Sequence, residues 1–230
     1  MLKLTNVNGF YGRSHALQDV DLVVPAGKIT AVLGRNGMGK TTLLRTLMGS
    51  IVRSTGSIEL DGARIDALPT HMRARSGMAY VPQGREIIPD FSVRQNIEMG
   101  AFAGRGPHTI PPLALELFPY LAANLDRPGG VLSGGQQQQL ALARALAAQP
   151  KVMLLDEPNE GIQPSVVEEI EAAITRLNRE FGMTMVLVEQ NIDFARRVAS
   201  HFAMFEKGSI VESGPIDWLT DEVVDRHMTF

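Results

Sequence analysis

The stretch "GRNGMGKTT", residues Gly34 to Thr42, decides the fold class. It matches the pattern G-x-x-x-x-G-K-[ST], in which glycines let the backbone turn so that successive N–H groups point at phosphate oxygens. The pattern requires a strand before it and a helix after it. The preceding "KITAVLG" is a short apolar run typical of a strand buried on both faces. The following "TTLLRTLMG" has apolar residues at helical spacing and ends at Gly49, a suitable C-cap.

The side chains of this loop suit a bound triphosphate. Lys40 brings a mobile positive charge to the β- and γ-phosphates, the Thr41 hydroxyl suits Mg²⁺, and Thr42 can reach the α-phosphate. The alternative is a glycine turn with a surface lysine, which leaves the matching strand and helix unexplained. The predicted nucleotide-binding residues of the loop are Gly34, Arg35, Asn36, Gly37, Met38, Gly39, Lys40, Thr41 and Thr42.

Composition narrows the class of protein further. The chain has 230 residues, of which 44% are hydrophobic and 20% charged, as in ordinary folded domains. Its net charge of −3 gives no reason to expect nucleic-acid binding, and the absence of cysteine excludes disulfides and fits a reducing cytoplasm. The sequence lacks a signal-peptide pattern and any uncharged apolar window of about 18 residues. Any role at a membrane is therefore expected to require a partner.

Two further apolar runs, "VMLLDEP" (152–158) and "MTMVLVE" (183–189), predict buried strands. Hairpin patterns at 57–65 ("SIELDGARI") and 202–214 ("FAMFEKGSIVESG") predict antiparallel pairs near the two ends of the chain. Strands alternating with helices indicate an α/β domain.

Between about Ser92 and Gln149 the strand signals vanish. The stretches "SVRQNIEMGAF" (92–102) and "LALELFPYLAANL" (113–125), and the run after Ser133, each predict a helix. We therefore expect one domain, 1–230. Its nucleotide-binding core comprises approximately 1–85 and 150–230, and a helical subdomain comprises approximately 86–149.

The run "VMLLDEP" delivers Asp156 and Glu157 to the carboxyl end of a strand, where open α/β sheets place their ligands. Asp156 can hold Mg²⁺, and Glu157 can polarise an attacking water as a general base. The alternative is a pair of acidic residues that simply end a buried strand. Gln83, in "YVPQG", follows another predicted strand and could sense Mg²⁺ or the γ-phosphate, but its spacing fits a surface glutamine equally well.

A second possible anion cradle lies in "LSGGQQQQLALARAL", residues 132–146, where a serine and two glycines precede a helix. With it, four motifs follow in order: "GRNGMGKT", "VPQG", "LSGGQ" and "VMLLDEP". In this order and spacing they resemble the Walker A, Q-loop, signature and Walker B motifs of ABC-transporter ATPase subunits, over essentially the whole chain. The resemblance implies an α/β P-loop NTPase (RecA-like) core with an N-terminal antiparallel β subdomain and an inserted α-helical signature subdomain. It also implies ATP and Mg²⁺ as cofactors.

The resemblance accounts for the second cradle. In this family two ATPase subunits pair head to tail, and the signature of one closes over the nucleotide in the other's P-loop. Ser133 and the N–H groups of Gly134 and Gly135 would give the γ-phosphate a second positive cap. The implied signature residues are Leu132, Ser133, Gly134, Gly135 and Gln136.

At other positions the chain matches the family pattern only in part. Tyr11, in "GFYGRSHAL", matches the aromatic residue that stacks on adenine, although a core tyrosine is the alternative. Gln190 stands where the family has a switch histidine; it can hydrogen-bond the γ-phosphate but cannot carry a proton. Because Glu157 is present, hydrolysis is still expected, with Glu157 and Gln190 as the catalytic residues. The D-loop corresponds to Asn159, Glu160, Gly161, Ile162 and Gln163, with Gln163 in place of the usual aspartate.

In these departures from the family pattern, the chain is similar to the ATPase subunits of branched-chain amino acid and urea importers. "YVPQGREIIPDFSV", "LSGGQQQQLALARAL", "EGIQPS" and "DFAR" look most like the urea, or short-chain amide, branch. An importer of branched-chain amino acids is the alternative. The resemblance implies a sister ATPase in a hetero- or homodimer, two integral-membrane permeases and a periplasmic or extracellular solute-binding protein. It places the chain on the cytoplasmic face of the membrane, without direct solute contact.

The stretch "GREIIPDFSVRQNI", after the Q-loop, lies where the family docks its permease. Ile87, Ile88 and Phe91 could line that surface, although packing in the core is equally compatible with them. A non-transport P-loop enzyme, such as a GTPase or a small-molecule kinase, is a distant alternative. It lacks support because a guanine-reading "NKxD" is absent and "LSGGQ" would be unexplained. A regulatory or nucleic-acid-handling ABC protein usually has two ATPase units or a long coiled-coil insert, and neither pattern is present.

Overall fold

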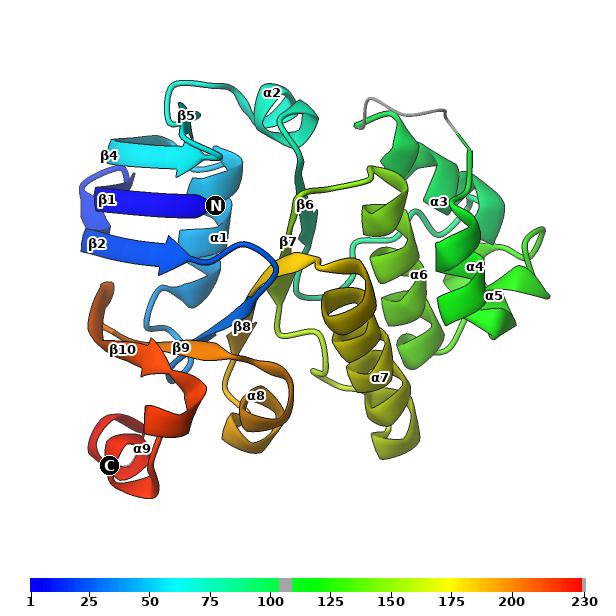
Figure 1. Cartoon of the computed structure of the whole chain (residues 1–230). Helices are drawn as coiled ribbons and strands as arrows, with labels where there is room; N and C mark the ends of the chain where they lie inside the picture. Colours follow the sequence, from blue (N-terminus) through cyan, green and yellow to red (C-terminus); the bar gives the residue numbers. More distant parts are fainter. Residues whose placement is uncertain (104–108, 229–230) are drawn as a thin grey trace.

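The phosphate-binding loop leaves the middle of a mixed six-stranded sheet, in the order β10-β9-β3-β8-β7-β6 (Figure 1). The computed structural model describes residues 1–103 and 109–228. Strands β6, β7, β8, β3 and β9 run parallel, and β10 is antiparallel to β9. Their bounds are β3 (Ile29–Leu33), β6 (Met78–Val81), β7 (Val152–Asp156), β8 (Thr184–Glu189), β9 (His201–Glu206) and β10 (Ser209–Pro215).

Every residue of β3, β7 and β8 is buried, as the continuous apolar runs predict. Alternate residues of these strands enter two separate cores because successive side chains point to opposite faces. In β3, Ile29, Ala31 and Leu33 belong to the core on the side of the helical insert, whereas Val32 faces the core around α1 (Lys40–Met48).

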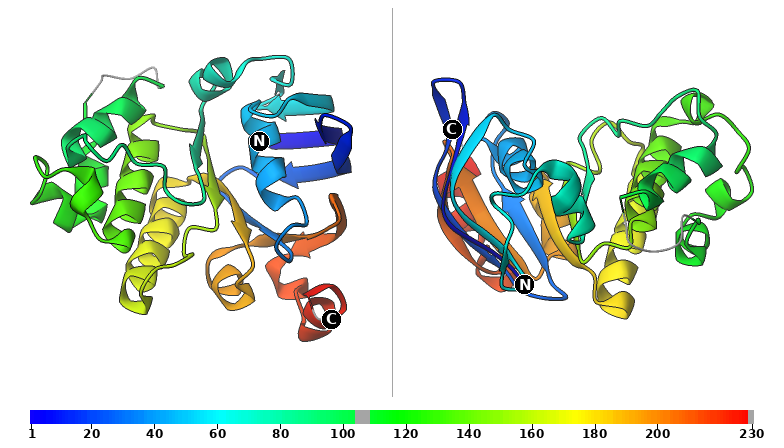
Figure 2. Two further views of the ribbon diagram at one scale, coloured as in Figure 1. Left: turned by 180° about the vertical axis from the view of Figure 1, so that it is seen from behind. Right: turned by 90° about the horizontal axis from the view of Figure 1, so that it is seen from above.

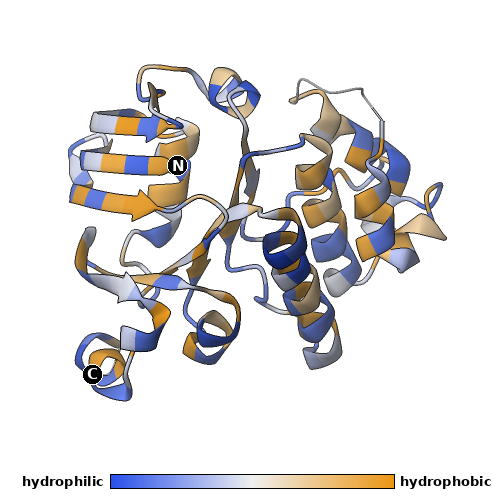
Figure 3. Cartoon of the chain, viewed as in Figure 1, coloured by the Kyte–Doolittle hydropathy of each residue, from blue (hydrophilic) through white to orange (hydrophobic). Residues whose placement is uncertain are grey.

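A second, antiparallel sheet has the order β2-β1-β4-β5. Helix α1 packs between this sheet and the central sheet (Figure 2). Blue and orange residues alternate along β1, β2 and β4, the pattern of a sheet with one solvated face (Figure 3). Both the antiparallel N-terminal sheet and the hairpin at 57–65 were expected from the sequence. The strands are β1 (Leu2–Tyr11), β2 (Ser14–Val24), β4 (Arg53–Leu60) and β5 (Ala63–Arg64).

The helical segment lies between β6 and β7 in the chain, on the far side of the central sheet from the antiparallel sheet (Figures 1 and 2). It contains α3 (Val93–Ala101), α4 (Pro112–Leu117), α5 (Pro119–Ala122), the 3₁₀ turn η1 (Gly129–Val131) and α6 (Gly134–Ala147). The remaining helices are α2 (Thr70–Arg75), α7 (Pro164–Phe181), α8 (Ile192–Val198), the 3₁₀ turn η2 (Ile216–Trp218) and α9 (Asp221–Met228). Within the described residues, no helix is long and apolar enough to cross a bilayer.

The single helix predicted over 113–125 is wrong. The structure has two short helices, α4 and α5, separated at Phe118. Phe118 has φ −128° and ψ 74°, because the following Pro119 disfavours the helical conformation for the residue before it. The break also places the Phe118 ring in the core, where it is 1% exposed.

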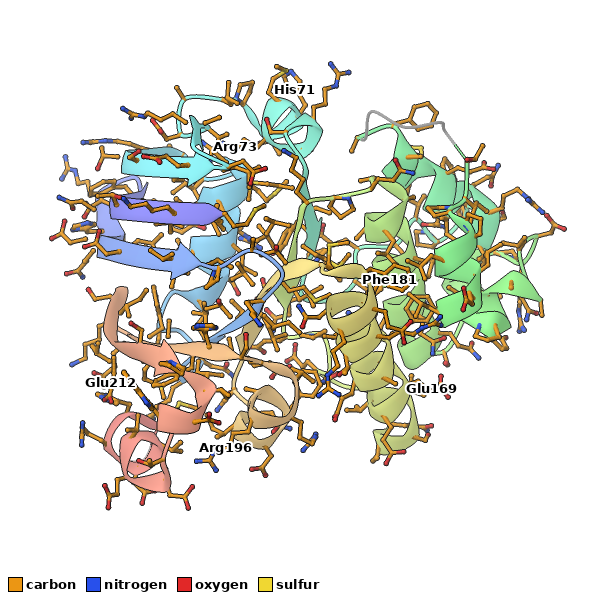
Figure 4. All side chains as sticks on the ribbon, viewed as in Figure 1. His71, Arg73, Glu169, Phe181, Arg196 and Glu212 are labelled. Atoms are coloured by element: carbon orange, nitrogen blue, oxygen red, sulfur yellow. The ribbon has the colours of Figure 1, made fainter. Side chains whose placement is uncertain are left out.

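The end of α1 is held by a buried arginine from α2. Arg73 is 2% exposed and lies between α2 and α1 (Figure 4). Its guanidinium donates to the carbonyl oxygens of Thr46 at 2.7 Å and Leu47 at 2.9 Å, in the last turn of α1. It also donates to the carbonyl oxygens of Asp66 and Leu68. Arg73 thus satisfies carbonyls that the helix end leaves free, and the positive charge lies at the negative end of the helix dipole.

We expect Arg73→Met to lower the free energy of unfolding by about 2–4 kcal/mol, because it leaves several buried carbonyl oxygens without a donor. Urea denaturation followed by circular dichroism measures the change. The matched control is Arg75→Met, which changes an exposed arginine of the same helix and should cost much less. Equal stability of the two variants would contradict the anchoring role.

Candidate nucleotide-binding and hydrolysis site

A cleft of 640 Å³ opens where β3 and β7 end and where the turn between β1 and β2 approaches them. It is lined by Tyr11, Ser14, His15, Ala16, Asn36, Gly37, Met38, Gly39, Lys40, Thr41, Thr42, Gln83, Glu157, Lys207 and Gly208. The cleft therefore brings together residues 36–42 of the phosphate loop with Tyr11, Gln83 and Glu157, as the sequence predicts. Ser14, His15, Ala16, Lys207 and Gly208 were missed, since no motif marks these turn residues.

Three glycines allow the loop to close tightly. Gly37 and Gly39 have φ of 80° and 105°, in the left-handed region that favours glycine. At Gly39 a Cβ atom would lie 3.1 Å from the carbonyl oxygen of Ala16, and at Gly34 it would overlap the carbonyl oxygen of Phe205. A side chain at either position would push the loop away from β2 or β9.

Lys40, the first residue of α1, is only 4% exposed, and the phosphate loop folds around its ammonium group. Its ammonium group donates to the carbonyl oxygen of Gly34 at 2.7 Å and to that of Arg35 at 3.1 Å. It also lies 3.3 Å from Oε1 of Glu157. Gly34 and Arg35 thus hold the lysine through their carbonyl groups rather than lining the cleft.

Asp156 ends β7 and is completely buried. Its Oδ1 accepts the hydroxyl of Thr41 at 3.1 Å, and its Oδ2 accepts the hydroxyl of Tyr80 at 2.9 Å. Burial raises the pKa of Asp156, and these two hydrogen bonds oppose the rise. The buried carboxylate beside a hydroxyl is a set of hard oxygen donors, which fits Mg²⁺ completed by phosphate oxygens and water. Sequence reasoning missed Tyr80, because a tyrosine in a buried strand signals packing alone.

Glu157 has φ 46°, an uncommon conformation for a residue with a side chain. Its backbone N–H donates to the carbonyl oxygen of Val188 at 3.0 Å, so the strand pairing continues through the turn. The carboxylate lines the cleft beside Lys40. A carboxylate in this place is able to accept a proton from a water molecule in the cleft.

Gln83 lies on the edge of the cleft and contacts the D-loop. Its Nε2 donates to Glu160 at 2.7 Å, which leaves Oε1 as the atom able to approach a cation. Arg85 donates to the carbonyl oxygens of Glu160 and Gly161 at 3.4 and 3.5 Å. The segment after β6 and the D-loop therefore form one connected surface. Helix α7 begins directly after the D-loop, whose other predicted residues are Asn159, Ile162 and Gln163.

The signature residues lie outside this cleft. Of the described residues that line it, none comes from 132–136. Ser133 is exposed and caps α6: its Oγ accepts the N–H of Gln136 at 3.4 Å, and Gln136 Oε1 accepts the N–H of Ser133 at 3.0 Å. This capping box occupies the oxygen of Ser133 and leaves its hydroxyl hydrogen free to donate outward.

Gln190 is exposed and, within the part of the chain that the structure describes, is not among the residues lining the cleft. Its neighbour Glu189 is 4% exposed. Oε2 of Glu189 accepts the N–H groups of Gln190 at 3.1 Å and Asn191 at 3.3 Å, while Oε1 is buried with no hydrogen-bond partner among the described residues. Burial raises the pKa of Glu189 to about 7. The motif comparison missed this group because it lies one residue before the expected switch position.

A sequence model of a known family, ABC transporter, matches residues 17–160, more than half of the chain. The chain belongs to the ABC transporter family. It is an ATPase of this family, with ATP and Mg²⁺ as its cofactors, which confirms the resemblance seen in the four motifs. The roles of individual site residues in this ABC ATPase stay predictions.

Relatives of the ABC ATPase span nearly its full length. It is 40% identical to the high-affinity branched-chain amino acid transport ATP-binding protein BraG of Pseudomonas aeruginosa, over 92% of this chain and 91% of that protein. It is 34% identical to the probable branched-chain amino acid transport ATP-binding protein LivF of Archaeoglobus fulgidus, over 96% of this chain and 94% of that protein.

Among solved structures, the ATP-binding cassette MJ0796, a dimer in a post-hydrolysis state bound to ADP and Pi, matches with a TM-score of 0.80. The identity is 28%, over 94% of this chain and 99% of that one. A nucleotide-free ATP-binding cassette from an ABC transporter matches with a TM-score of 0.83 at 23% identity, over 100% of this chain and 95% of that one, and shows the shared fold. These matches confirm the fold class predicted from the sequence.

We expect Glu189→Gln to change how stability depends on pH. The carboxyl group has an ordinary pKa of 4.5 and a pKa of about 7 in the folded chain, so between these values the native state keeps a proton that the unfolded state releases. Stability of the ABC ATPase should therefore fall as pH rises through this window, and the fall should be complete above about pH 7. The glutamine variant lacks this dependence and should gain up to about 3 kcal/mol relative to wild type between pH 5 and pH 8.

Urea unfolding of the full chain at several pH values measures this difference. Asp193→Asn, which changes an exposed carboxylate in the first turn of α8, is the control and should follow the wild-type pH dependence. Parallel curves for wild type and Glu189→Gln would show that Glu189 ionises normally.

Proposed function

We propose that this chain is the ATP-hydrolysing subunit of an ABC importer and acts in a head-to-tail pair of ATPase subunits at the cytoplasmic face of the membrane. The observation that carries the proposal is the separation of two anion cradles on one chain. The cleft of Lys40 and Glu157 contains the phosphate loop, whereas the cap at Ser133 lies on a different part of the surface. Each cradle can complete a site only with the other cradle of a second ATPase subunit.

The residues of the cleft divide the work of hydrolysis between them. The N–H groups of the loop and the Lys40 ammonium would bind the β- and γ-phosphates, and Thr41 and Asp156 would hold Mg²⁺, whose charge would neutralise phosphate charge. Phosphate oxygens compete with Glu157 for Lys40, and Glu157 is then free to act as a base. The water oxygen bonds to the γ-phosphorus, the bond to the bridging oxygen breaks, and Glu157 takes the water proton.

The partner subunit supplies the second cap. Its hydroxyl at the signature serine and the first N–H groups of its signature helix would donate to the γ-phosphate from the opposite side. The dimeric state of MJ0796 with ADP and Pi supports the same pairing here, since that cassette shares the fold over 94% of this chain. Nucleotide then joins the two subunits, and its cleavage lets them part.

An apolar cavity of 320 Å³ supports a permease-docking surface beside the helical segment. It is lined by Met48, Ala74, Met78, Ala79, Tyr80, Ile88, Met99, Gly100, Ala103, Arg144, Ala145 and Ala148. Methionines suit a surface that accepts apolar side chains of a partner. Of the three residues expected here, Ile88 lines the cavity and Phe91 is exposed, whereas Ile87 packs against the core. We assign this cavity to a short apolar helix of a permease.

For the solute we propose urea or a short-chain amide, on the resemblance of the segments at 80–93 and 132–146 to that branch. Branched-chain amino acids are the second candidate, favoured by the names of the relatives BraG and LivF. The ATPase itself would not touch the solute. A solute-binding protein and two permeases would recognise and carry it.

The base assignment predicts that Glu157→Gln lowers the ATPase rate by about 10²–10⁴-fold, because the amide cannot accept the water proton. ATP binding should persist, and ATP-bound pairs should accumulate. Steady-state ATPase rates are measured against protein concentration, and size-exclusion chromatography with ATP detects the pairs. Glu168→Gln, at an exposed position of α7, is the control. Turnover unchanged by Glu157→Gln would contradict the assignment.

The transport proposal predicts that a strain lacking this chain loses high-affinity uptake of labelled urea and keeps uptake of leucine. Wild-type chain supplied in trans should restore uptake, and the Glu157→Gln variant should not, because transport needs hydrolysis. Loss of leucine uptake alone would favour the second candidate. If neither solute is affected, both solute assignments fail.

A further inference from the structure

Tyr80 belongs to two sites at once. Its hydroxyl donates to Oδ2 of Asp156 at 2.9 Å, in the metal-binding part of the cleft. The same side chain lines the apolar cavity beside Met78, Ile88 and Met99. Tyr80 is therefore a single side chain in contact both with the metal-binding carboxylate and with a surface open to a partner.

The strand pairing explains why tyrosine can make this contact. Tyr80 pairs with Leu154 in the parallel register of β6 and β7, so Asp156 lies two residues farther along the neighbouring strand, on the same face. A phenol ring is long enough to carry its hydroxyl over this distance. Since β6 is the edge strand of the sheet, its residues Met78, Ala79 and Tyr80 can also line the cavity together with residues of the helical segment.

The Asp156 carboxylate is held from two sides. Thr41, at the start of α1, donates to Oδ1, and Tyr80 donates to Oδ2. Without Tyr80, Oδ2 of a completely buried carboxylate would lose its donor, and only the Thr41 hydrogen bond would fix the rotation of the group.

We propose that Tyr80 is a positioning residue that holds Asp156 in the orientation needed for Mg²⁺ and conveys to it the occupancy of the apolar cavity. The second half of this statement rests on the proposed docking of a permease in that cavity. Hydrogen bonds between two oxygen atoms in proteins span about 2.5–3.0 Å, and they weaken as their geometry departs from this range. A partner side chain that moves the ring by a few tenths of an ångström, at a bond of 2.9 Å, therefore changes how firmly Asp156 is held.

Tyr80→Phe tests the positioning role in the full chain alone. Binding of a fluorescent ATP analogue is titrated with Mg²⁺, and the Mg²⁺ concentration giving half of the effect should rise about tenfold, as expected for one lost hydrogen bond to a charged group. Binding of the analogue without Mg²⁺ should stay as in wild type. The control is Tyr120→Phe, which removes a hydroxyl that accepts a hydrogen bond from Arg127 at 2.9 Å. Tyr120 lies far from Asp156 in the sequence.

Two results of this titration would overturn the positioning role. One is an unchanged Mg²⁺ dependence, and the other is an equal loss of binding with and without Mg²⁺, which indicates general damage to the cleft. Neither result bears on whether a permease docks, because the chain is tested alone.

The coupling role is tested in the complex with the permeases. Tyr80→Phe should co-purify with them, but at saturating Mg²⁺ their stimulation of its ATPase should fall at least several-fold. Full stimulation of the variant would reject the coupling. If the permeases fail to bind even wild-type chain, the docking proposal fails and the coupling with it, whereas the Mg²⁺ titration still decides the positioning role.

Discussion

The buried ammonium group of Lys40 is the interaction on which the nucleotide cleft depends. A charge removed from water must be met by partners, and those of Lys40 are two carbonyl oxygens of its own loop and the carboxylate of Glu157. To supply them, the loop wraps back over its own lysine, which requires glycine conformations at Gly37 and Gly39. Glu157 in turn adopts a left-handed backbone conformation. One charge thereby fixes both the phosphate loop and the place of Glu157.

The parallel sheet then concentrates acidic groups around that lysine. Because β3, β8 and β7 are consecutive parallel strands, Asp156, Glu157 and Glu189 reach the same edge of the sheet as the end of β3. Burial raises the pKa of Asp156 and of Glu189, so the edge resists carrying its full negative charge. A divalent cation bound beside Asp156, as proposed, would offset part of this cost. The same environment leaves Glu189 protonatable near neutral pH, next to a residue, Gln190, that cannot carry a proton.

Local sequence patterns predicted the elements and the motifs but not the contacts between them. The loop at 34–42, the strand before Asp156 and the helix after Ser133 are each specified by residues adjacent in the chain, so their spacing was readable. The hydrogen bond from Tyr80 to Asp156 joins residues on different strands, and nothing in either local pattern indicates it. Local patterns likewise give no sign that Oε1 of Glu189 is buried without a hydrogen-bond partner among the described residues, or that Lys207 lines the cleft. Pro119 could have predicted the helix break at Phe118, but the prediction of a single helix gave more weight to the spacing of the apolar residues.

The separation of the two cradles has an energetic consequence under the proposed pairing. The signature end of α6 is already ordered, because Ser133 and Gln136 cap it through their own side chains. The phosphate loop is ordered by Lys40 in the same way. Neither half needs to be ordered when nucleotide arrives, so less conformational entropy is lost on association and more of the binding free energy favours closure. Two preformed halves on rigid elements therefore suit the proposed pairing, in which nucleotide binding would be converted into movement between partners.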